Sequence, residues 1–291
     1  MSTTSRSPVI AAVDGSPSSA AAVAWAADEA GARGLPLHLV HVYVPPSVRY
    51  PLDGAASDEL TDALREQGGQ WLAEAAKEVE RLRPDVAVRT ELLPGWPVER
   101  LLAVSDGAAV VVTGHRGLNG FEGLLLGSVS DSVSAHAGCP VVVVRGTESD
   151  SGPVVVGVDG SESSTATLEF AFAEASRRGA GLVVVHAWND TAYAGAWVPV
   201  PIVVDWDAIA EDARLALAEV TAGFAERYPD VAVDRVVVRG RAAQALVERS
   251  AGARLVVVGR RGRRLLTGLG MGSTSRAVLH HSACPVAVVH P

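Results

Sequence analysis

The residues best placed to do chemistry form two glycine-rich segments with identical spacing. The first runs Gly114–Gly117 (GHRG), then nine residues, then Gly127–Ser128, and the second runs Gly259–Gly262 (GRRG), nine residues, then Gly272–Ser273. Glycines let backbone N–H groups approach a ligand, and the serine opens a helix whose N-terminus favours negative charge. The pattern predicts a phosphate cradle in each half. The alternative is a turn that only connects a strand to a helix.

The two segments belong to a repeat with a period of 145 residues. PVIAAVDGS at 8–16 aligns with PVVVGVDGS at 153–161, and CPVVVV at 139–144 aligns with CPVAVV at 284–289. A period this long indicates tandem domains rather than a solenoid of small repeats. We therefore expect one domain over residues 1–146, a polar linker at 147–152, and a second domain over 153–291.

Within each half, short valine-rich runs alternate with helical segments, which predicts an α/β domain with a parallel sheet covered on both faces. The expected strands of the first half are Val9–Val13, Leu37–Val44, Val86–Leu92, Ala109–Thr113 and Val141–Val144. The expected helices are Ala20–Ala32, Asp58–Leu82, Pro97–Val104 and Ser128–His136. Gly68 and Gly69 should weaken the second helix. In a doubly wound sheet the ligand lies beyond the carboxyl ends of the strands, where both VDGS and the glycine loops fall.

Composition excludes several other classes. The formal charge is 25 basic minus 33 acidic side chains, or −8, which disfavours nucleic acid and anionic membranes. The two cysteines, Cys139 and Cys284, form neither a disulfide framework nor a metal motif, and we expect them to be small buried residues. No stretch approaches 18 unbroken apolar residues and no signal peptide is visible, so a cytoplasmic protein is expected.

These motifs together resemble a tandem universal stress protein. Both halves carry VDGS (13–16 and 158–161), a central VHV or VHA (40–42 and 185–187), and the complete glycine pattern of the ATP-binding form of that family. The resemblance implies a five-stranded parallel sheet in each half, Rossmann-like and similar to the adenine nucleotide alpha hydrolases. It also implies one ATP site per half, with pairing through the last strand, either in a homodimer or between the two halves of one chain.

The resemblance also implies roles for particular residues. Asp14 and Asp159 would lie near the ribose or polyphosphate by way of magnesium, Ala12 and Gly157 would leave room for the nucleotide, and main-chain groups of Val42 and Ala187 would meet adenine. The remaining implied contacts are Gly114, His115, Arg116, Gly117, Gly127, Ser128 and Val129 in the first half, and Gly259, Arg260, Arg261, Gly262, Gly272, Ser273 and Thr274 in the second.

The loops depart from one another in charge. The second carries Arg260, Arg261, Arg263 and Arg264, whereas the first has Arg116 and the titratable His115. This favours stronger triphosphate binding in the second half. The alternative is that these arginines face solvent.

Three functions stay open at the level of sequence. The favoured one is a regulatory protein of the stress response that binds ATP and changes conformation or affinity for an unknown protein partner. The alternatives are a slow ATPase or phosphoryl transferase, for which no catalytic constellation is visible, and an interaction module with non-functional pockets. ATP is not distinguished from AMP or cyclic AMP. His41 and His186 are expected to be hydrogen-bonded residues of the core or pocket rim, and segments 45–56 and 190–205 to form lids or partner-binding loops.

Overall fold

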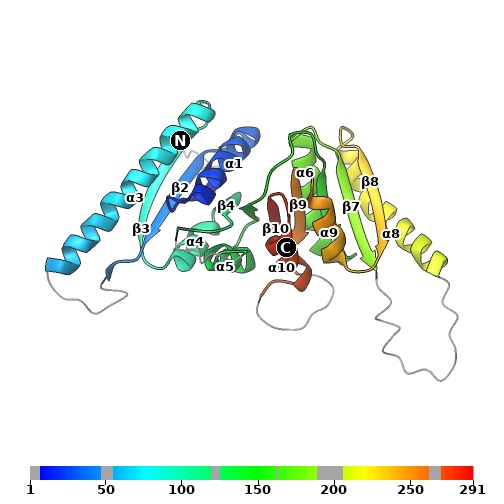
Figure 1. Ribbon diagram of the computed structural model, residues 1–291. Helices are drawn as coiled ribbons and strands as arrows, with labels where there is room; N and C mark the ends of the chain where they lie inside the picture. The colour runs from blue at the N-terminus through cyan, green and yellow to red at the C-terminus, as the bar shows by residue number, and fades with distance from the viewer. Residues whose placement is uncertain are drawn as a thin grey trace, which may run out of the picture. The chain divides into compact units, whose positions relative to one another are not determined.

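The chain divides into two α/β units. The computed structural model describes residues 7–46, 55–118, 125–161, 163–188, 206–261 and 270–290. The two compact units are Met1–Arg145 and Gly146–Pro291, hereafter unit 1 and unit 2 (Figure 1). Each unit holds a parallel sheet with helices on both faces, so the expected fold class is confirmed.

Five strands form the sheet of unit 1, in the order β3-β2-β1-β4-β5, with every pair parallel. The strands are β1 Val9–Ala12, β2 Leu37–Tyr43, β3 Val88–Pro94, β4 Val110–Gly114 and β5 Val141–Val144. Val9 in the central strand pairs with Leu37 on one side and with Val110 on the other. The chain therefore leaves β1 and β4 towards opposite faces, and a crevice is expected where these two strands end.

Among the described residues of unit 1, two pairs of helices cover this sheet. They are α1 Pro17–Arg33 and α3 Ala55–Leu82 on one face, and α4 Pro97–Ser105 and α5 Ser128–His136 on the other (Figure 1). Ser16 caps α1 by accepting a hydrogen bond from Ser19 N, and Gly34 ends the helix with a left-handed φ of 61°. The cap matters for the site because it begins α1 directly beyond the end of β1.

The paired glycines do not interrupt α3, which continues through both of them. A Cβ atom on Gly68 would overlap the His41 imidazole and come within 2.9 Å of Leu92 Cδ1, while one on Gly69 would meet no atom within 4 Å. Gly68 therefore lets α3 approach strand β2 closely. The lower intrinsic helix propensity of the pair is outweighed by this packing.

Unit 2 repeats the architecture with strand order β10-β9-β6-β7-β8, again all parallel. The strands are β6 Val154–Val158, β7 Leu182–Trp188, β8 Val233–Arg239, β9 Leu255–Gly259 and β10 Val286–Val289. The helices are α6 Ser163–Arg177, α8 Trp206–Arg227, α9 Ala242–Ser250 and α10 Ser273–His281.

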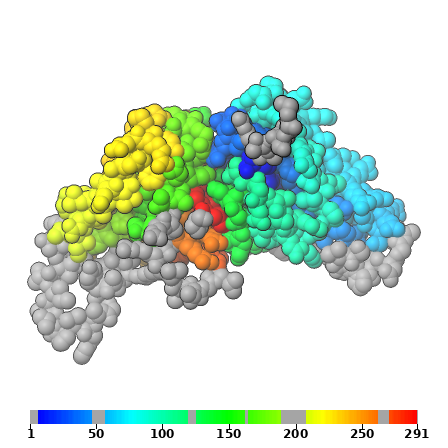
Figure 2. Space-filling view, turned by 180° about the vertical axis from the view of Figure 1, so that it is seen from behind, coloured from blue at the N-terminus to red at the C-terminus, as the bar shows by residue number. Residues whose placement is uncertain are grey.

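The outer helix α8 shows how amphipathic spacing builds a unit. Leu217, Thr221 and Phe224 are buried at helical spacing, whereas Leu215 and Val220 are exposed on the surface of α8, yellow in Figure 2. Phe224 stacks on Phe172 of α6 with ring centroids 5.3 Å apart. The aliphatic core of the central strands is thus extended outward by one aromatic layer.

Among the helices of the described residues, none has the length and apolar character needed to cross a membrane. Cys139 and Cys284 are buried, as the sequence predicted, and neither is part of a disulfide.

Candidate functional site

The turn after β1 is held by a carboxylate. Asp14 Oδ1 accepts hydrogen bonds from Ser16 N at 3.0 Å and Ser16 Oγ at 2.6 Å. Gly15, between them, has φ 79° and lies against the Trp71 indole of α3, so a side chain is excluded there by both conformation and space. Asp14 is therefore fixed at the carboxyl end of the central strand, where the sequence predicted it.

The glycine loop after β4 is held by hydrogen bonds to the start of α5. Gly127 N donates to His115 O at 2.7 Å, and Ser130 Oγ donates to Gly114 O at 2.6 Å. A Cβ on Gly114 would overlap Ser18 of α1. The two ends of the glycine pattern, nine residues apart in sequence, are thereby brought together at the start of α5.

Further contacts join this loop to the start of α1. Ser18 Oγ lies 3.0 Å from His115 Nδ1 and accepts a hydrogen bond from Arg116 N at 3.3 Å. A Cβ on Gly117 would come 2.5 Å from Asp14 Oδ2. The predicted residues Asp14, His115, Arg116 and Gly117 are thereby brought together beyond the ends of β1 and β4. Ala12 ends β1 and Val42 lies near the end of β2, both half-buried, and Ser128 and Val129 begin α5.

The environment of His115 disfavours its charged form. Burial lowers the pKa of His115 below its usual range, and the positive charges of Arg116 and Arg145 lower the pKa further, although the backbone contact with Val144 opposes the shift. His115 is therefore neutral at pH 7.

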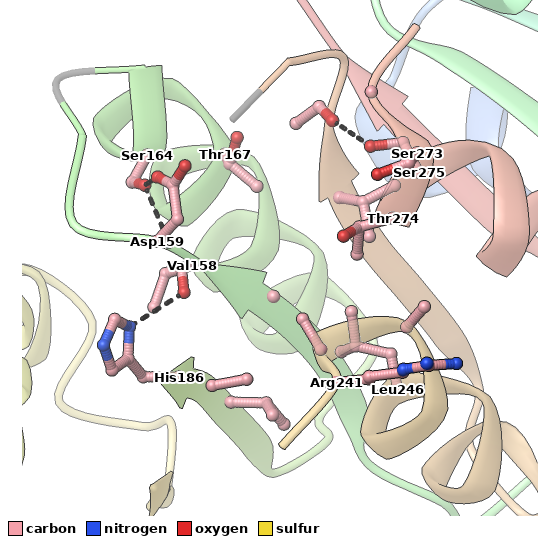
Figure 3. Close-up of a pocket in the computed structure, with 18 of the residues that line it drawn as sticks. Val158, Asp159, Ser164, Thr167, His186, Arg241, Leu246, Ser273, Thr274 and Ser275 are labelled. Atoms are coloured by element: carbon pink, nitrogen blue, oxygen red, sulfur yellow. Dashed lines mark hydrogen bonds between the residues drawn. The ribbon is translucent and has the colours of Figure 1, made fainter. Parts of the chain in front are cut away.

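Unit 2 builds the same turn with an additional hydroxyl. Asp159 Oδ1 accepts hydrogen bonds from Ser161 N at 3.0 Å, Ser161 Oγ at 2.6 Å and Ser164 Oγ at 2.9 Å (Figure 3 shows Asp159 beside Ser164). Three donors on one oxygen favour the ionised carboxylate and fix its orientation.

The second glycine loop repeats the contacts of the first. Gly272 N donates to Arg260 O at 2.8 Å, and Ser275 Oγ donates to Gly259 O at 2.6 Å. Gly272 precedes α10 in an extended conformation (φ −61°, ψ 151°) and, having no side chain, does not cap the first N–H groups of α10. Burial lowers the pKa of Arg260, with Arg261 contributing, but a guanidinium keeps its charge in proteins. The predicted Gly262 lies outside the described residues.

A cavity of about 730 Å³ opens at this end of unit 2 (Figure 3). It lies beyond the ends of the strands and at the starts of helices α9 and α10. The predicted residues that line it are Gly157, Asp159, Ala187, Gly259, Arg261, Gly272, Ser273 and Thr274. Of the described residues predicted for this site, Arg260 alone is not among those lining the cavity. This volume falls in the range of roughly 300–1,000 Å³ that is usual for small-molecule and cofactor sites.

Several residues that line the cavity were not predicted from the sequence. Gly240, Arg241 and Leu246, from the start of α9, line it, as do Ser164 and Thr167 of α6 and Ser275 of α10. The available signal was the pairing of Gly240 with Gly95 one period earlier in the sequence. A Cβ on Gly157 would come 2.7 Å from Leu246 Cδ1, so this glycine makes room for Leu246 as well as facing the cavity.

The strand histidines have the hydrogen-bonded role that was expected. His41 Nδ1 lies 2.7 Å from Val13 O, and His186 Nδ1 lies 3.1 Å from Val158 O (Figure 3). A carbonyl oxygen only accepts hydrogen bonds, so Nδ1 carries the proton in both rings. Each histidine thereby ties the end of one strand to the next, and His186 also lines the cavity.

Magnesium has no dedicated site within the described residues, which contain no group of three or more His, Cys, Asp or Glu side chains able to hold a metal ion. The single carboxylates Asp14 and Asp159 fit an ion that arrives with a polyphosphate and keeps most of its water, as Mg²⁺ commonly does.

Comparison with known proteins gives consistent matches over both units. A model of the universal stress protein family matches residues 6–145 and again residues 151–290. A universal stress protein of Mycobacterium tuberculosis (strain ATCC 25618 / H37Rv) is 42% identical over 293 residues, covering 96% of each chain. One from Mycolicibacterium smegmatis is 39% identical over 290 residues, covering 97% of each. The crystal structure of a universal stress protein from Archaeoglobus fulgidus DSM 4304 has a TM-score of 0.70 at 21% identity, covers 99% of both chains, and supports the fold.

Proposed function

The chain belongs to the universal stress protein family in its tandem form, and from this premise we propose that it is a regulatory ATP-binding protein with one nucleotide site in each unit. Bound nucleotide would change the conformation of a unit, or its affinity for a partner protein, in the response to stress. The observation that carries the proposal is the cavity of unit 2, where strand ends, an oriented carboxylate and an uncapped helix N-terminus meet.

Different parts of that cavity suit different parts of the nucleotide. The N–H groups at the start of α10, which Gly272 does not cap, and the hydroxyls of Ser273 and Thr274 suit the phosphates. The main chain at Ala187 and the apolar surface of Leu246 suit the adenine base. Magnesium, when bound with the nucleotide, would neutralise phosphate charge beside Asp159.

The two sites should differ in strength. Arg261 lines the cavity of unit 2 and Arg260, beside it, adds a second permanent charge to the loop, whereas the first loop has Arg116 and a neutral His115. Because phosphate binding gains from each nearby cation, we propose that unit 2 binds ATP more tightly than unit 1 at neutral pH.

The test uses two glycines whose backbone conformations do not require glycine. Gly127 and Gly272 have extended backbone conformations that any residue adopts, and a Cβ on Gly127 would have its nearest neighbour at 3.5 Å. Gly127→Val and Gly272→Val should therefore fold normally but place a side chain where phosphate binds. We expect each substitution to weaken ATP binding at its own site by about 10-fold or more, measured by calorimetric titration of the full chain.

Matched controls are available in both units. Gly69→Val and Gly223→Val add a side chain at exposed glycines whose Cβ would meet no atom within 4 Å, in helices α3 and α8 and not in the glycine loops, and should leave ATP binding unchanged. Gly127→Val leaves the site of unit 2 intact and Gly272→Val leaves the site of unit 1 intact, so equal affinities of these two remaining sites for ATP would refute the proposed difference between them. Absence of nucleotide from natively purified protein, together with no binding in titration, would refute the function. Substantial phosphate release from ATP would instead indicate an ATPase.

The proposal extends to location and assembly. We expect a cytoplasmic protein that forms a homodimer or pairs its own two units through their last strands. Sedimentation of the full chain over a range of concentrations distinguishes the two arrangements, because only a homodimer has a mass that depends on concentration.

A further inference from the structure

Arg241 gives the cavity of unit 2 a positive charge that the equivalent position of unit 1 lacks. It lines the cavity beside Gly240, and its counterpart one period earlier in the sequence is Trp96. We propose that Arg241 binds a second anionic group of the ligand, so that unit 2 accepts an adenine nucleotide with an additional phosphate on its ribose. The inference rests on the proposed function and names the ligand class of one of its two sites.

A shared turn places Arg241 and Trp96 at equivalent points. Gly240 N donates to the carbonyl oxygen of the last residue of β7 at 2.9 Å, and Gly95 N donates to that of the last residue of β2 at 2.9 Å. Both glycines have positive φ, 141° and 132°, which favours glycine. The next residue has nearly the same backbone conformation in both units, with φ −88° and ψ 119° for Arg241 and φ −81° and ψ 130° for Trp96. The units therefore differ here in the side chain and not in the backbone.

The same hydrogen bond places Arg241 at one end of the cavity. Its acceptor, Trp188, ends β7, whereas the second glycine loop follows β9 and is joined to the start of α10 through Gly272 N. Strand β6 lies between β7 and β9 and pairs with both. Since neighbouring strands are about 4.8 Å apart, the ends of β7 and β9 are separated by roughly 10 Å. Figure 3 shows Arg241 and Ser273 apart from each other, so Arg241 lies at the end of the cavity that suits the base and ribose.

The guanidinium of Arg241 is available to a ligand. Arg241 is exposed, and its side chain has no hydrogen bond or ion pair within the part of the chain that the structure describes. Asp159, the one carboxylate among the described residues that line the cavity, is bonded to serine hydroxyls and lies apart from Arg241 in Figure 3.

The chemistry of a guanidinium selects the kind of group that fits beside it. Arginine binds phosphate through two parallel N–H···O hydrogen bonds, which are stronger than those between neutral groups. An adenine nucleotide with phosphates on its 5′ oxygen alone carries its negative charge at the α10 end of the cavity. A phosphate on the 2′ or 3′ oxygen of the ribose would bring a second negative charge to the end where Arg241 lies.

Unit 1 has an indole in place of this cation. Trp96 is uncharged and 48% exposed. The nearest arginine in sequence, Arg100, donates from Nε to Pro94 O at 2.8 Å, and a Cβ atom on Gly95 would come 2.7 Å from the same nitrogen. That arginine therefore holds the turn of unit 1. The preference for a second phosphate should belong to unit 2 alone.

The experiment compares 5′-AMP with adenosine 2′,5′-bisphosphate and adenosine 3′,5′-bisphosphate by calorimetric titration at low ionic strength. The full chain carries Gly127→Val, which blocks the site of unit 1, and ATP is titrated in parallel. We expect one of the bisphosphates to bind about tenfold more tightly than AMP, as for a hydrogen bond to a charged group. The stronger of the two identifies the ribose oxygen that faces Arg241.

Substitution of Arg241 should remove this preference. In Arg241→Gln we expect the ratio of the two affinities to fall to less than about twofold, with the affinity for AMP within about twofold of its value before the substitution. Arg241→Lys keeps the charge without the paired N–H geometry and should retain part of the preference. Arg214→Gln is the matched control, because it removes the same charge from α8, and none of the described residues that line the cavity belongs to α8. This control should leave the preference unchanged.

The outcomes separate the inference from its premise. Equal affinities for AMP and both bisphosphates would overturn the inference. A loss in Arg241→Gln that is the same for all three ligands would also overturn it, because Arg241 would then contact a group that they share. So would an Arg214→Gln variant that loses the preference as fully as Arg241→Gln, since net charge alone would explain the result. Failure of the chain to bind either AMP or ATP would overturn the proposed function instead.

Discussion

At the scale of single residues, the glycines around the site of unit 1 are required for different physical reasons. Gly15 has positive φ, Gly114 and Gly117 avoid overlap with Ser18 and Asp14, and Gly127 meets neither constraint. Only the last kind is left to be explained by a ligand. The sequence alone does not distinguish a glycine needed for its backbone conformation, for close packing or for ligand binding. Substitution at Gly127 therefore tests binding, whereas substitution at Gly114 would test folding.

The thiol of Cys139 provides a prediction about reactivity. Burial raises the pKa of Cys139 to about 11, so the thiolate that reacts with electrophiles is scarce at neutral pH. We expect iodoacetamide at pH 8 to leave Cys139 unmodified in the native chain over the time in which a free thiol in a peptide is fully alkylated. Mass spectrometry after digestion would measure the modified fraction.

The same chain unfolded in denaturant serves as the control, in which both cysteines should react. Rapid alkylation of Cys139 in the folded chain at pH 8 would show that the thiol is exposed or activated.

The raised pKa of Cys139 also links stability to pH. Because its pKa is higher in the folded than in the unfolded chain, the contribution of Cys139 to the free energy of unfolding is fully present below the unfolded pKa and is lost as pH rises towards 11.

The residues of the site that could be predicted are those that belong to a local sequence motif. The turn at Asp14 and the loop at Gly114–Gly117 were found because carboxyl ends of parallel strands share one edge of the sheet. The wall formed by Gly240, Arg241 and Leu246 was not, since it depends on where α9 packs. The contact between Ser18 and His115 joins residues 97 positions apart, and no sequence periodicity encodes it.

At the scale of elements, strand and helix types were predicted throughout unit 1, while several boundaries moved. The helix expected at Ser128–His136 and the strand at Val141–Val144 match. The strand expected at Val86–Leu92 is observed at Val88–Pro94, because its register is set by pairing with β2, from Leu37↔Val88 to Tyr43↔Pro94. The alternation of apolar and polar residues predicts which side chains share a face of the sheet, but it does not predict where a strand begins and ends.

Helix α6 contains a buried charge cluster that yields the next prediction. Glu174 is fully buried, contacts Arg177, and accepts a hydrogen bond from Arg178 Nε at 3.0 Å. Glu174→Gln would remove the carboxylate charge that lies beside these two partly buried guanidinium groups. We expect the free energy of unfolding of unit 2 to fall by about 3 kcal/mol, measured by urea denaturation.

An exposed ion pair in the same unit gives the matched control. Glu211 and Arg214 are 2.9 Å apart on the surface of α8, with side chains about 60% exposed. Glu211→Gln should change stability by less than about 0.5 kcal/mol. Equal effects of the two substitutions would mean that burial of Glu174 does not determine its contribution.

At the scale of the whole molecule, the repeat preserves contacts as well as motifs. Ser105 Oγ accepts a hydrogen bond from Gly138 N at 3.0 Å in unit 1, and Ser250 Oγ accepts one from Ala283 N at 2.8 Å in unit 2. Each bond ties the end of one helix to the turn before the last strand. The duplicated chain thus keeps the scaffold constant, while charge varies in the loops, at positions 115 and 260.

The segment between the repeats has a structural role that its composition does not suggest. Thr147 N donates to Ala283 O at 2.9 Å, Ser149 N donates to Ala253 O at 3.3 Å, and Glu148 pairs with Arg178 at 2.7 Å. Polar and glycine-flanked sequence predicts a linker at 147–152, but these residues bond to unit 2. We therefore propose that they belong to the fold of that unit.

Truncation measures this contribution. A fragment of residues 146–291 should have a larger free energy of unfolding than one of residues 153–291, by about 2–3 kcal/mol, because two backbone hydrogen bonds and a partly buried ion pair are retained. Urea denaturation followed by circular dichroism gives both values. In the longer fragment, Glu148→Ala should remove only the part due to Arg178. Identical urea midpoints for the two fragments would show that residues 147–152 act only as a linker. The free energy lost in ordering them would then equal the free energy gained from their contacts.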